Sequence, residues 1–395
     1  MRDVPENVIV VGGGPVGLSF ALAASRHAAL NVHLIESAAP SLAPTDLQFD
    51  HRIYALSPAS KAFLESIGAW QDMPRERIAP VTAMRVYGDD RVSEMELQQR
   101  SALAYIVESN RLSAALWGQV LGQTRDAQRI TVHAPCKPSG LSFDQAAGGA
   151  TLTLHDGAQL NASLVVGADG ANSWVRQQAG LRADNRSYES FAVVANFECE
   201  KAHGGVARQW FAADSVLAWL PLPGKQISIV WSTGVAQAER LMQLSPVALA
   251  DAVRLAGDES LGALKCVSLV ARFPLQRILA APWVAAHLAL MGDAAHVIHP
   301  LAGQGVNLGF SDARLLSELL GNKSQLSSSG DLALLRKYER GRKENVLAMT
   351  VMTDQLKTLF SQRSKGLTRL RNAGLTFTDR QRWLKRRLIQ YALSG

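Results

Sequence analysis

The residues best suited to hold a charged ligand lie between Met291 and Gly309. The apolar run 288–290 is typical of a short buried strand, and Gly292-Asp293 follows it at the end where open α/β sheets bind their ligands. Gly303-Gln304-Gly305 then indicates the start of a helix that continues through Val306 and Asn307. We expect this stretch to present one carboxylate together with a set of backbone amides.

Glycines beside a helix start let backbone N–H groups approach a ligand closely, and the helix dipole favours negative charge there. A reduced flavin carries its negative charge along one edge of the ring. The stretch therefore predicts a flavin site, with Asp293 on a polyol hydroxyl and the amides of residues 303–307 on the ring. His296 and His299 have the spacing of metal ligands, but two histidines without a carboxylate complete no metal site, so we interpret them as structural or flavin-shielding.

A second glycine cluster lies near the start of the chain. The apolar run 8–11 predicts a parallel strand, and a G-x-G-x-x-G motif follows it directly, at Gly12, Gly14 and Gly17. A helical pattern and a second strand, 31–35, lead to Glu36. This order indicates a dinucleotide site, with a tight turn, a close approach to the pyrophosphate and a carboxylate for a ribose hydroxyl. NAD and FAD both stay open, and the alternative is a glycine turn that only packs a helix on a strand.

Three more polar residues are candidates for ligand contacts, each with a structural alternative. Asp169 follows a predicted strand, 160–166, and precedes a helix, so it can bind the ligand or cap the helix. Arg52 can bridge cofactor and substrate, because its guanidinium is always charged and rich in donors, or it can be a surface residue. Arg111 lies near a helix start, where a positive charge opposes the dipole; this indicates a ligand phosphate or adenine, or else a solvated side chain.

The stretch 191–231 alternates in hydropathy and predicts several antiparallel strands, distinct in character from the parallel ones. Within it, Phe211, Trp219 and Trp231 can wall an apolar substrate pocket, although aromatic residues in a sheet are more often plain core. The remaining pattern predicts strands at 84–87, 130–133, 151–154 and 267–273, and helices at 246–255 and 332–359.

Length and composition narrow the class of protein. A chain of 395 residues with 47% hydrophobic residues and a mean hydropathy of +0.02 is typical of a globular protein with two domains and no membrane-spanning run. The three cysteines, Cys136, Cys199 and Cys266, form no C-x-x-C pair, which favours a reducing compartment and no structural zinc. We therefore expect a cytoplasmic protein.

The net charge of +7 is concentrated at the end of the chain. Residues 336–395 carry 15 Lys and Arg against 4 Asp and Glu, whereas the other residues carry 26 against 30. A basic segment of this kind does not indicate a nucleic-acid-binding fold. Residues 380–393 have the pattern of a basic amphipathic helix with a tryptophan, which can lie peripherally on the inner membrane, bind a partner protein or pack on its own core.

Several separated segments together resemble the single-component FAD-dependent aromatic hydroxylases, the class whose prototype is para-hydroxybenzoate hydroxylase. The glycines of 12–17 with Glu36 are similar to the family's ADP-binding motif, 167–170 to its Asp-Gly motif, and 292–296 to the motif whose Asp contacts the FAD ribityl chain. The chain resembles the ubiquinone-biosynthesis ring hydroxylases in particular at three places. These are residues 299–309 with Asp312, the motif Arg52-x-x-Ala55-Leu56-Ser57, and the predicted sheet at 208–231. The resemblance covers about residues 5 to 350.

The resemblance implies a mixed α/β fold. A Rossmann-like FAD-binding domain would be interleaved with an antiparallel β-sheet substrate domain and followed by C-terminal helices. We expect the FAD-binding domain at 1–78, 107–182 and 279–335, the substrate domain at 79–106 and 183–278, and a basic helical segment at 336–395.

The activity implied by the resemblance is hydroxylation of the aromatic ring of a lipophilic prenylphenol in ubiquinone biosynthesis. NADPH or NADH, binding transiently, reduces the FAD, and O₂ then forms a C4a-hydroperoxyflavin that delivers the hydroxyl group. Because the flavin carries the chemistry, no residue is assigned as the catalyst, and Arg52, Pro300 and Gln304 are the nearest candidates. Two alternatives stay open: an isoprenoid double-bond reductase, which needs no oxygen, and an FAD-binding scaffold within a ubiquinone-synthesis complex.

Overall fold

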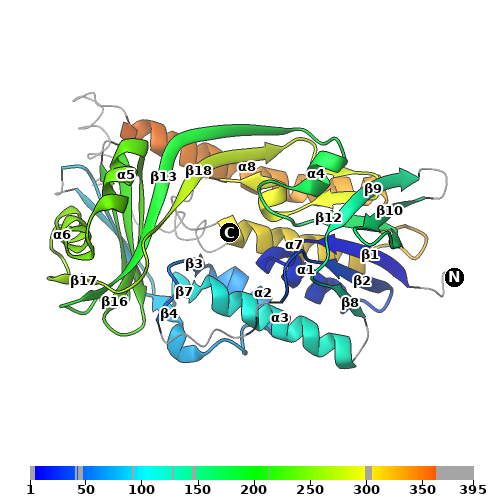
Figure 1. Cartoon of the computed structure of the whole chain (residues 1–395), viewed down its shortest axis with the longest axis horizontal. Helices are drawn as coiled ribbons and strands as arrows, with labels where there is room; N and C mark the ends of the chain where they lie inside the picture. Colours follow the sequence, from blue (N-terminus) through cyan, green and yellow to red (C-terminus); the bar gives the residue numbers. More distant parts are fainter. Residues whose placement is uncertain are drawn as a thin grey trace.

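The computed structural model describes residues 5–40, 42, 48–90, 93–126, 129–144, 148–212, 214–298 and 305–361. Its two largest sheets differ in character: the parallel one lies at one end of the molecule, and the other has most of its strands at the opposite end (Figure 1). One is mostly parallel and packs against the helices that follow the glycine motifs, and the other is mostly antiparallel. The mixed α/β fold class expected from the sequence is confirmed.

The parallel sheet has six strands in the order β19-β20-β12-β1-β2-β8. These are Val284–Ala285, Leu288–Leu290, Leu164–Gly167, Glu6–Val11, Leu30–Ile35 and Ile130–His133. All neighbours pair in parallel except β19, which runs antiparallel to β20. The register aligns the last residues of β1, β2, β12 and β20, so the turns that follow these strands open at one edge of the sheet.

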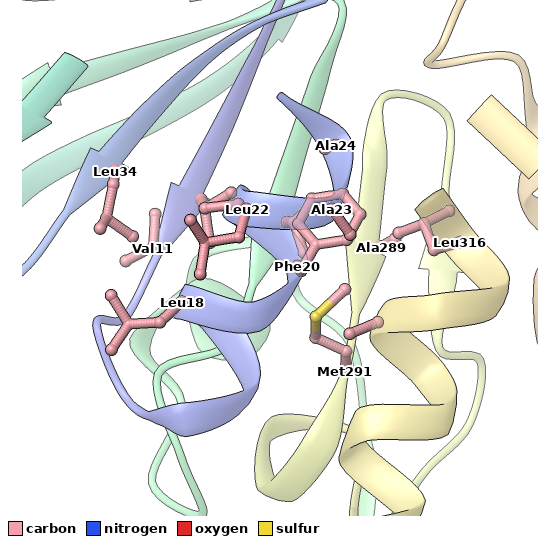
Figure 2. Close-up of a cluster of buried hydrophobic side chains, with 14 of the residues drawn as sticks. Val11, Leu18, Phe20, Leu22, Ala23, Ala24, Leu34, Ala289, Met291 and Leu316 are labelled. Carbon is pink, nitrogen blue, oxygen red and sulfur yellow. The ribbon is translucent and has the colours of Figure 1, made fainter. Parts of the chain in front are cut away.

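Helices cover this sheet because their apolar residues are buried against it. In α1 (Pro15–Ala24) nearly every residue after Val16 is buried, and Leu18, Phe20 and Leu22 are fully so. Figure 2 shows these side chains between the strand residues of β1 and β2 and the Met291 and Leu316 side of the core. Each such large apolar side chain stabilises the fold by roughly 1.5–3 kcal/mol. The other helices of this half are α2 (Pro58–Ser66), α3 (Ser109–Asp126), α4 (Trp174–Gln178), α7 (Gly305–Gly321) and α8 (Leu332–Ser361).

The second large sheet has the strand order β21-β18-β13-β16-β15-β14-β5-β6, with the short β17 also pairing with β13. The strands are His296–Val297, Ala271–Ala280, Ala183–Cys199, Gln226–Gly234, Ser215–Leu222, Val206–Ala212, Ala83–Tyr87, Glu94–Gln98 and, for β17, Leu264–Cys266. Its long strands β13 and β18 extend from the α4 end of the molecule to the α5 and α6 end (Figure 1). Helices α5 (Val235–Gln243) and α6 (Pro246–Ala256) bury one of its faces.

The opposite face of this sheet packs on a small sheet, β3-β7-β4, made of Ile53–Leu56, Ala104–Glu108 and Ala79–Val81. Another small antiparallel sheet, β11-β10-β9, comprises Gln159–Ala162, Gly149–Leu154 and Pro138–Asp144. The small sheet β3-β7-β4 therefore contributes to the core on that face of the large antiparallel sheet.

Two strand predictions were wrong in detail. The expected single strand at 160–166 is two strands in different sheets, β11 and β12, which part at Ser163 because its amide donates to the Asn7 carbonyl (2.9 Å). The expected strand at 267–273 is interrupted as well: β17 ends at Cys266 and β18 begins at Ala271. There the Ser268 hydroxyl oxygen accepts a hydrogen bond from the Asn196 amide (2.8 Å) in place of a ladder partner.

In the described part of the chain, no helix is both long enough and apolar enough to cross a bilayer. The expected basic helix at 380–393 lies outside the described residues.

The half-buried pair His33 and His133 gives the stability of the parallel sheet a pH dependence. Their rings are stacked, with Nδ1 and Nε2 3.3 Å apart. Burial lowers the pKa of both imidazoles, repulsion from His133 lowers that of His33 further, and Asp156 acts in the opposite direction on His133. The unfolded chain binds these protons first, so stability is lost as pH falls below about 6.5.

Thermal unfolding at about pH 8 and about pH 6 checks this expectation. On acidification, the melting temperature of His33→Gln should fall less than that of the native chain. His155→Gln changes an exposed histidine and should behave like the native chain. Equal losses in all three proteins would contradict it.

Candidate cofactor site

Three turns of the chain meet at one edge of the parallel sheet. Backbone hydrogen bonds join them: the Gly12 amide donates to Ile35 O (2.9 Å), Ala168 N to Val11 O (2.8 Å) and Met291 N to Gly167 O (3.0 Å). The segments predicted from the three glycine and aspartate motifs are therefore adjacent in space, at the carboxyl ends of β1, β12 and β20. This is the edge at which open α/β sheets bind ligands.

The glycines of the first turn have different roles. Gly12 has φ +113°, and a Cβ there would overlap the carbonyl oxygen of Ala168, while a Cβ on Gly17 would overlap the carbonyl oxygen of Gly12. Gly14, at the N-terminus of α1, is exposed, and a Cβ there would meet no protein atom within 4 Å. Gly12 and Gly17 thus hold the turn together, and Gly14 leaves open space in front of a helix N-terminus. This cradle fits a pyrophosphate group.

Glu36 follows β2 beside this turn, as the dinucleotide pattern requires. Its Oε2 accepts a hydrogen bond from the Gly13 amide (2.6 Å), and its Oε1 accepts from the Ala38 amide (2.9 Å) and the Ser37 hydroxyl (3.0 Å). The carboxylate is only partly buried, so it keeps acceptor capacity for a ribose hydroxyl while it holds the glycine turn in place.

Asp169 caps helix α4, which is the structural alternative considered for it. Its Oδ2 accepts from the Val175 amide (3.0 Å), and its Oδ1 accepts from the hydroxyl of Ser173, the N-cap residue (2.5 Å). Arg176 on the same helix donates to Ala294 O (2.7 Å) beside Asp293. The second motif therefore positions the third one, and the half-buried Asp169 lies at their junction.

Asp293 is the carboxylate that faces solvent at this junction. It lies in a short 3₁₀ turn, Gly292–Ala294, and is exposed although protein surrounds it on most sides. Burial raises the pKa of its carboxyl group, and the nearby His296 and Arg52 side chains act in the opposite direction. An enclosed acceptor that solvent still reaches is suited to a polyol hydroxyl.

Arg52 lies near Asp293 and is exposed, with its guanidinium 5.8 Å from the centre of the Tyr54 ring. Its amide donates to Asp50 Oδ1 (3.0 Å), and its carbonyl accepts from the Ser109 amide (2.9 Å). The backbone is therefore held while the side chain is exposed and close enough to Asp293 to influence its pKa. Arg111 is different, because its Nε lies 3.9 Å from Glu108 Oε2 and part of its charge is compensated within the protein.

Glu108, a residue missed by the sequence interpretation, organises this region. It is 1% exposed and accepts two hydrogen bonds from Arg77, Nε to Oε2 (2.7 Å) and Nη2 to Oε1 (2.6 Å), and one from the Asp50 amide (2.8 Å). Its position at the end of β7, just before helix α3, was a usable signal. Arg77 lies in a separate short turn, η1 (Arg75–Arg77), and nothing in its local sequence connects it to Glu108.

Helix α7 starts at Gly305, and its first turn contains Val306 and Asn307. The first four N–H groups of a helix have no partner within the helix, so these amides are available to an anion. The Asn307 side chain is buried and donates to Ala55 O (2.8 Å) while it accepts from the Ser57 amide (2.9 Å). It fixes α7 to β3, which Arg52 precedes. The expected cofactor ligand Gly303, the catalytic candidates Pro300 and Gln304, and His299 lie outside the described residues.

A buried carboxylate on α7 supports the Asp293 turn. Asp312 accepts from the Gly292 amide (3.0 Å), from His296 Nε2 (2.6 Å) and from Arg342 Nε (2.7 Å). His296 is therefore a structural residue, as interpreted from the sequence, and its partner is a carboxylate sixteen residues away. No group of three or more His, Cys, Asp and Glu side chains suited to a metal ion occurs among the residues that the structure describes.

The three aromatic residues expected in a substrate pocket are not brought together. Phe211 lies on the face of the large sheet that packs on β3, β4 and β7, among residues such as Ile53 and Leu220. Trp219 and Trp231 belong to the opposite face, in the core covered by α5 and α6. Alternation along β14, β15 and β16 causes this separation, because neighbouring side chains of a strand point to opposite faces.

Comparison with known proteins identifies the class. Residues 6–353 match the family model described as FAD binding domain. The chain belongs to that family. It is 33% identical over 401 residues to 3-demethoxyubiquinol 3-hydroxylase of Escherichia coli K12, covering all of both chains. It is also 33% identical over 396 residues to ubiquinone hydroxylase UbiL of Rhodospirillum rubrum, covering 99% of this chain and 90% of the relative.

Human mitochondrial ubiquinone biosynthesis monooxygenase COQ6 is 32% identical over 441 residues, covering 99% of this chain and 93% of the relative. The chain is thus an FAD-dependent monooxygenase similar to ubiquinone-biosynthesis hydroxylases, and the family and cofactor expected from its motifs are confirmed.

Solved structures share the fold at lower sequence identity. PqsL of Pseudomonas aeruginosa, a probable FAD-dependent monooxygenase, matches with a TM-score of 0.76 and 22% identity, covering 94% of this chain and 100% of that one. The p-nitrophenol 4-monooxygenase PnpA of Pseudomonas putida has a TM-score of 0.76 and 20% identity, covering 100% of this chain and 99% of that one. Klebsiella pneumoniae HpxO, solved with FAD and uric acid, has a TM-score of 0.73 and 18% identity, covering 99% of this chain and 97% of that one.

The different roles of Gly12 and Gly14 lead to a paired prediction. Gly12→Ala should lower the melting temperature of the FAD-free protein, because a left-handed residue gains a Cβ that overlaps Ala168. Gly14→Ala should leave that melting temperature unchanged but weaken FAD binding by about tenfold or more, since its Cβ occupies the cofactor's approach. Thermal unfolding without FAD and titration with FAD check both. Two variants with the same profile would count against this division of roles.

Proposed function

We propose that this protein hydroxylates the aromatic ring of a prenylated phenol in ubiquinone biosynthesis. The observation that supports it most directly is full-length similarity to several proteins named for ubiquinone hydroxylation, together with an FAD cradle built from all three motif turns. When bound, FAD reduced by NADPH or NADH supplies the activation of O₂. The protein contributes binding, orientation and exclusion of water.

The roles of the protein's residues in FAD binding follow from their positions. The turn at Gly12 and Gly14 and the α1 N-terminus hold the pyrophosphate, and Glu36 binds a ribose hydroxyl. Asp293 accepts a polyol hydroxyl, and the amides of the first α7 turn favour the negatively charged edge of the reduced ring. Arg52 provides an exposed positive charge near Asp293.

The substrate ring would lie against the face of the large sheet that carries Phe211. On this face Val216, Ala218, Leu220 and Val230 are only half-buried, although they lie in the middle of a sheet. Solvent therefore reaches an apolar surface there, which suits an apolar substrate. Trp219 and Trp231 support the same strands from the other face.

Oxygen dependence distinguishes this proposal from the reduction of an isoprenoid double bond. The FAD-loaded protein with NADPH or NADH, a short-chain prenylphenol and ¹⁸O₂ should yield a product that contains one labelled oxygen atom. Mass spectrometry of the product checks this. Turnover of the prenylphenol without oxygen, with two hydrogen atoms gained, would instead establish a reductase. No product in either condition would leave the FAD-binding scaffold as the function.

Two buried residues of the large sheet provide matched variants for the same assay. Phe211→Ala should raise KM for the prenylphenol by about tenfold, because an apolar wall is lost from the ligand face. Leu217→Ala, on the opposite face, should lower thermal stability without this change in KM. An unchanged KM in Phe211→Ala would remove this face from the proposal.

We further propose that the basic terminal segment keeps the enzyme at the cytoplasmic surface of the inner membrane, where a lipophilic substrate resides. The excess of 15 basic over 4 acidic residues in 336–395 supports this. Removing residues 380–395 should abolish sedimentation with anionic vesicles while FAD binding persists. If the truncated protein still sediments with these vesicles, the segment is not the anchor. If the full chain does not bind vesicles at all, a partner protein takes the place of the membrane.

A further inference from the structure

A buried ionic cluster connects helix α8 with the cofactor site. Asp312 is fully buried, His296 is 2% exposed and Arg342 is 5% exposed. One carboxylate oxygen accepts from His296 Nε2 and from the Gly292 amide, and the other accepts from Arg342 Nε. The cluster thus joins α8, the middle of α7 and the turn that carries Asp293.

Arg342 contacts both parts of the predicted flavin-binding stretch. Its Nη2 donates to Leu308 O (3.2 Å) in the first turn of α7, while its Nε holds Asp312, which binds the amide next to Asp293. Four residues earlier on the same helix face, the Tyr338 hydroxyl donates to Leu290 O (2.9 Å) at the end of β20. Helix α8 therefore fixes the strand end, the turn and the start of α7 relative to one another.

The charge of Arg342 is what allows a carboxylate in this position. Burial acts to raise the pKa of Asp312, but His296 and Arg342 outweigh it and hold the pKa below its ordinary value. A buried carboxylate that loses a cationic partner is strongly destabilising unless it takes up a proton. Without Arg342, Asp312 has to take up a proton or remain a buried carboxylate that lacks its guanidinium partner.

We infer that Arg342 is a positioning residue for FAD, acting through Asp312 on the Asp293 turn and through Leu308 on the first turn of α7. The inference rests on FAD binding and is independent of which substrate is hydroxylated. By this inference, helix α8 contributes to the cofactor site, although it follows all three nucleotide motifs in the chain.

The charged groups around the cluster decide how the variants respond to pH. Asp312 interacts with His296, which follows the Asp293 turn, and with Arg342 and Tyr338, which lie on α8. Glu339 acts on Tyr338. Asp293 interacts with His296 and Arg52. Burial raises the pKa of Tyr338 far above its ordinary value, so it stays neutral. Asp293 and Arg52 are unchanged in every variant below, so their own titration is common to all.

The test measures the dissociation constant of FAD, from the change in flavin fluorescence, between about pH 6 and about pH 9. Arg342→Met removes the charge and keeps an extended side chain. Arg342→Lys restores a positive charge at the same place. Arg340→Met changes an exposed arginine on the same helix and serves as the control. Thermal unfolding without FAD reports whether each variant is folded.

In Arg342→Met, FAD affinity should fall by about tenfold or more as pH rises, because Asp312 then becomes a buried carboxylate without its guanidinium partner. Arg342→Lys and Arg340→Met should follow the pH profile of the native chain. If Arg342 served only for packing, Arg342→Met would weaken FAD binding equally at every pH. That result, or native affinity throughout, would overturn the inference.

A double variant keeps the inference testable if Arg342→Met does not fold. Arg342→Met with Asp312→Asn contains no uncompensated buried charge, so it should fold. Its FAD affinity should be weaker than that of the native chain, because the positioning contacts are lost, and should have the native chain's pH profile, because the Asp312 carboxyl group is lost as well. Native affinity in this double variant would show that the ion pair does not position FAD.

Discussion

The contact between the backbones of Gly12 and Ala168 is the constraint on which the whole cofactor site depends. It requires a residue without a Cβ at φ +113°, packed directly on the neighbouring turn. Because β1 lies between β2 and β12, this contact brings the first and second motifs together, and the pairing of β12 with β20 adds the third. A single close approach in the middle of a parallel sheet thus places residues from three distant parts of the chain around one ligand.

The large antiparallel sheet reaches this site at two places: β21, which directly follows the Asp293 turn, pairs with β18, and the backbone segment 49–57 contacts both parts. Asn196 of β13 donates to the carbonyls of Phe49 and Asp50, Glu108 accepts from the Asp50 amide, and Asn307 binds Ala55 and Ser57. The segment carries Arg52 on its exposed side. The backbone on both sides of Arg52 is therefore fixed both to the large sheet and to α7.

The sequence allowed the parallel sheet and the three turns to be predicted, including the position of Asp293 in the third turn, because strand, glycine turn and helix start are each encoded within a few neighbouring residues. The roles of Glu108 and Arg342 could not be predicted, since their partners, Arg77 and Asp312, are about 30 residues away and are brought close only by packing. The local sequence pattern also could not predict on which face of the large sheet Phe211 and Trp219 lie. Alternation shows that neighbours face opposite sides, but not which side the helices cover.

The three motif carboxylates differ in how far the protein already engages them, and this follows from where each one lies in its turn. Asp169 precedes α4 closely enough to reach its first amides, so it is engaged as a cap, and Glu36 is bound to Gly13. Asp293 lies in a turn whose amide is already bound by Asp312, so its own carboxylate has no helix amide to satisfy and can face outward. A buried acid behind the turn thus leaves the acid in front available to the cofactor. By this argument the Asp293 site depends on Asp312 and its partner Arg342 as much as on its own motif.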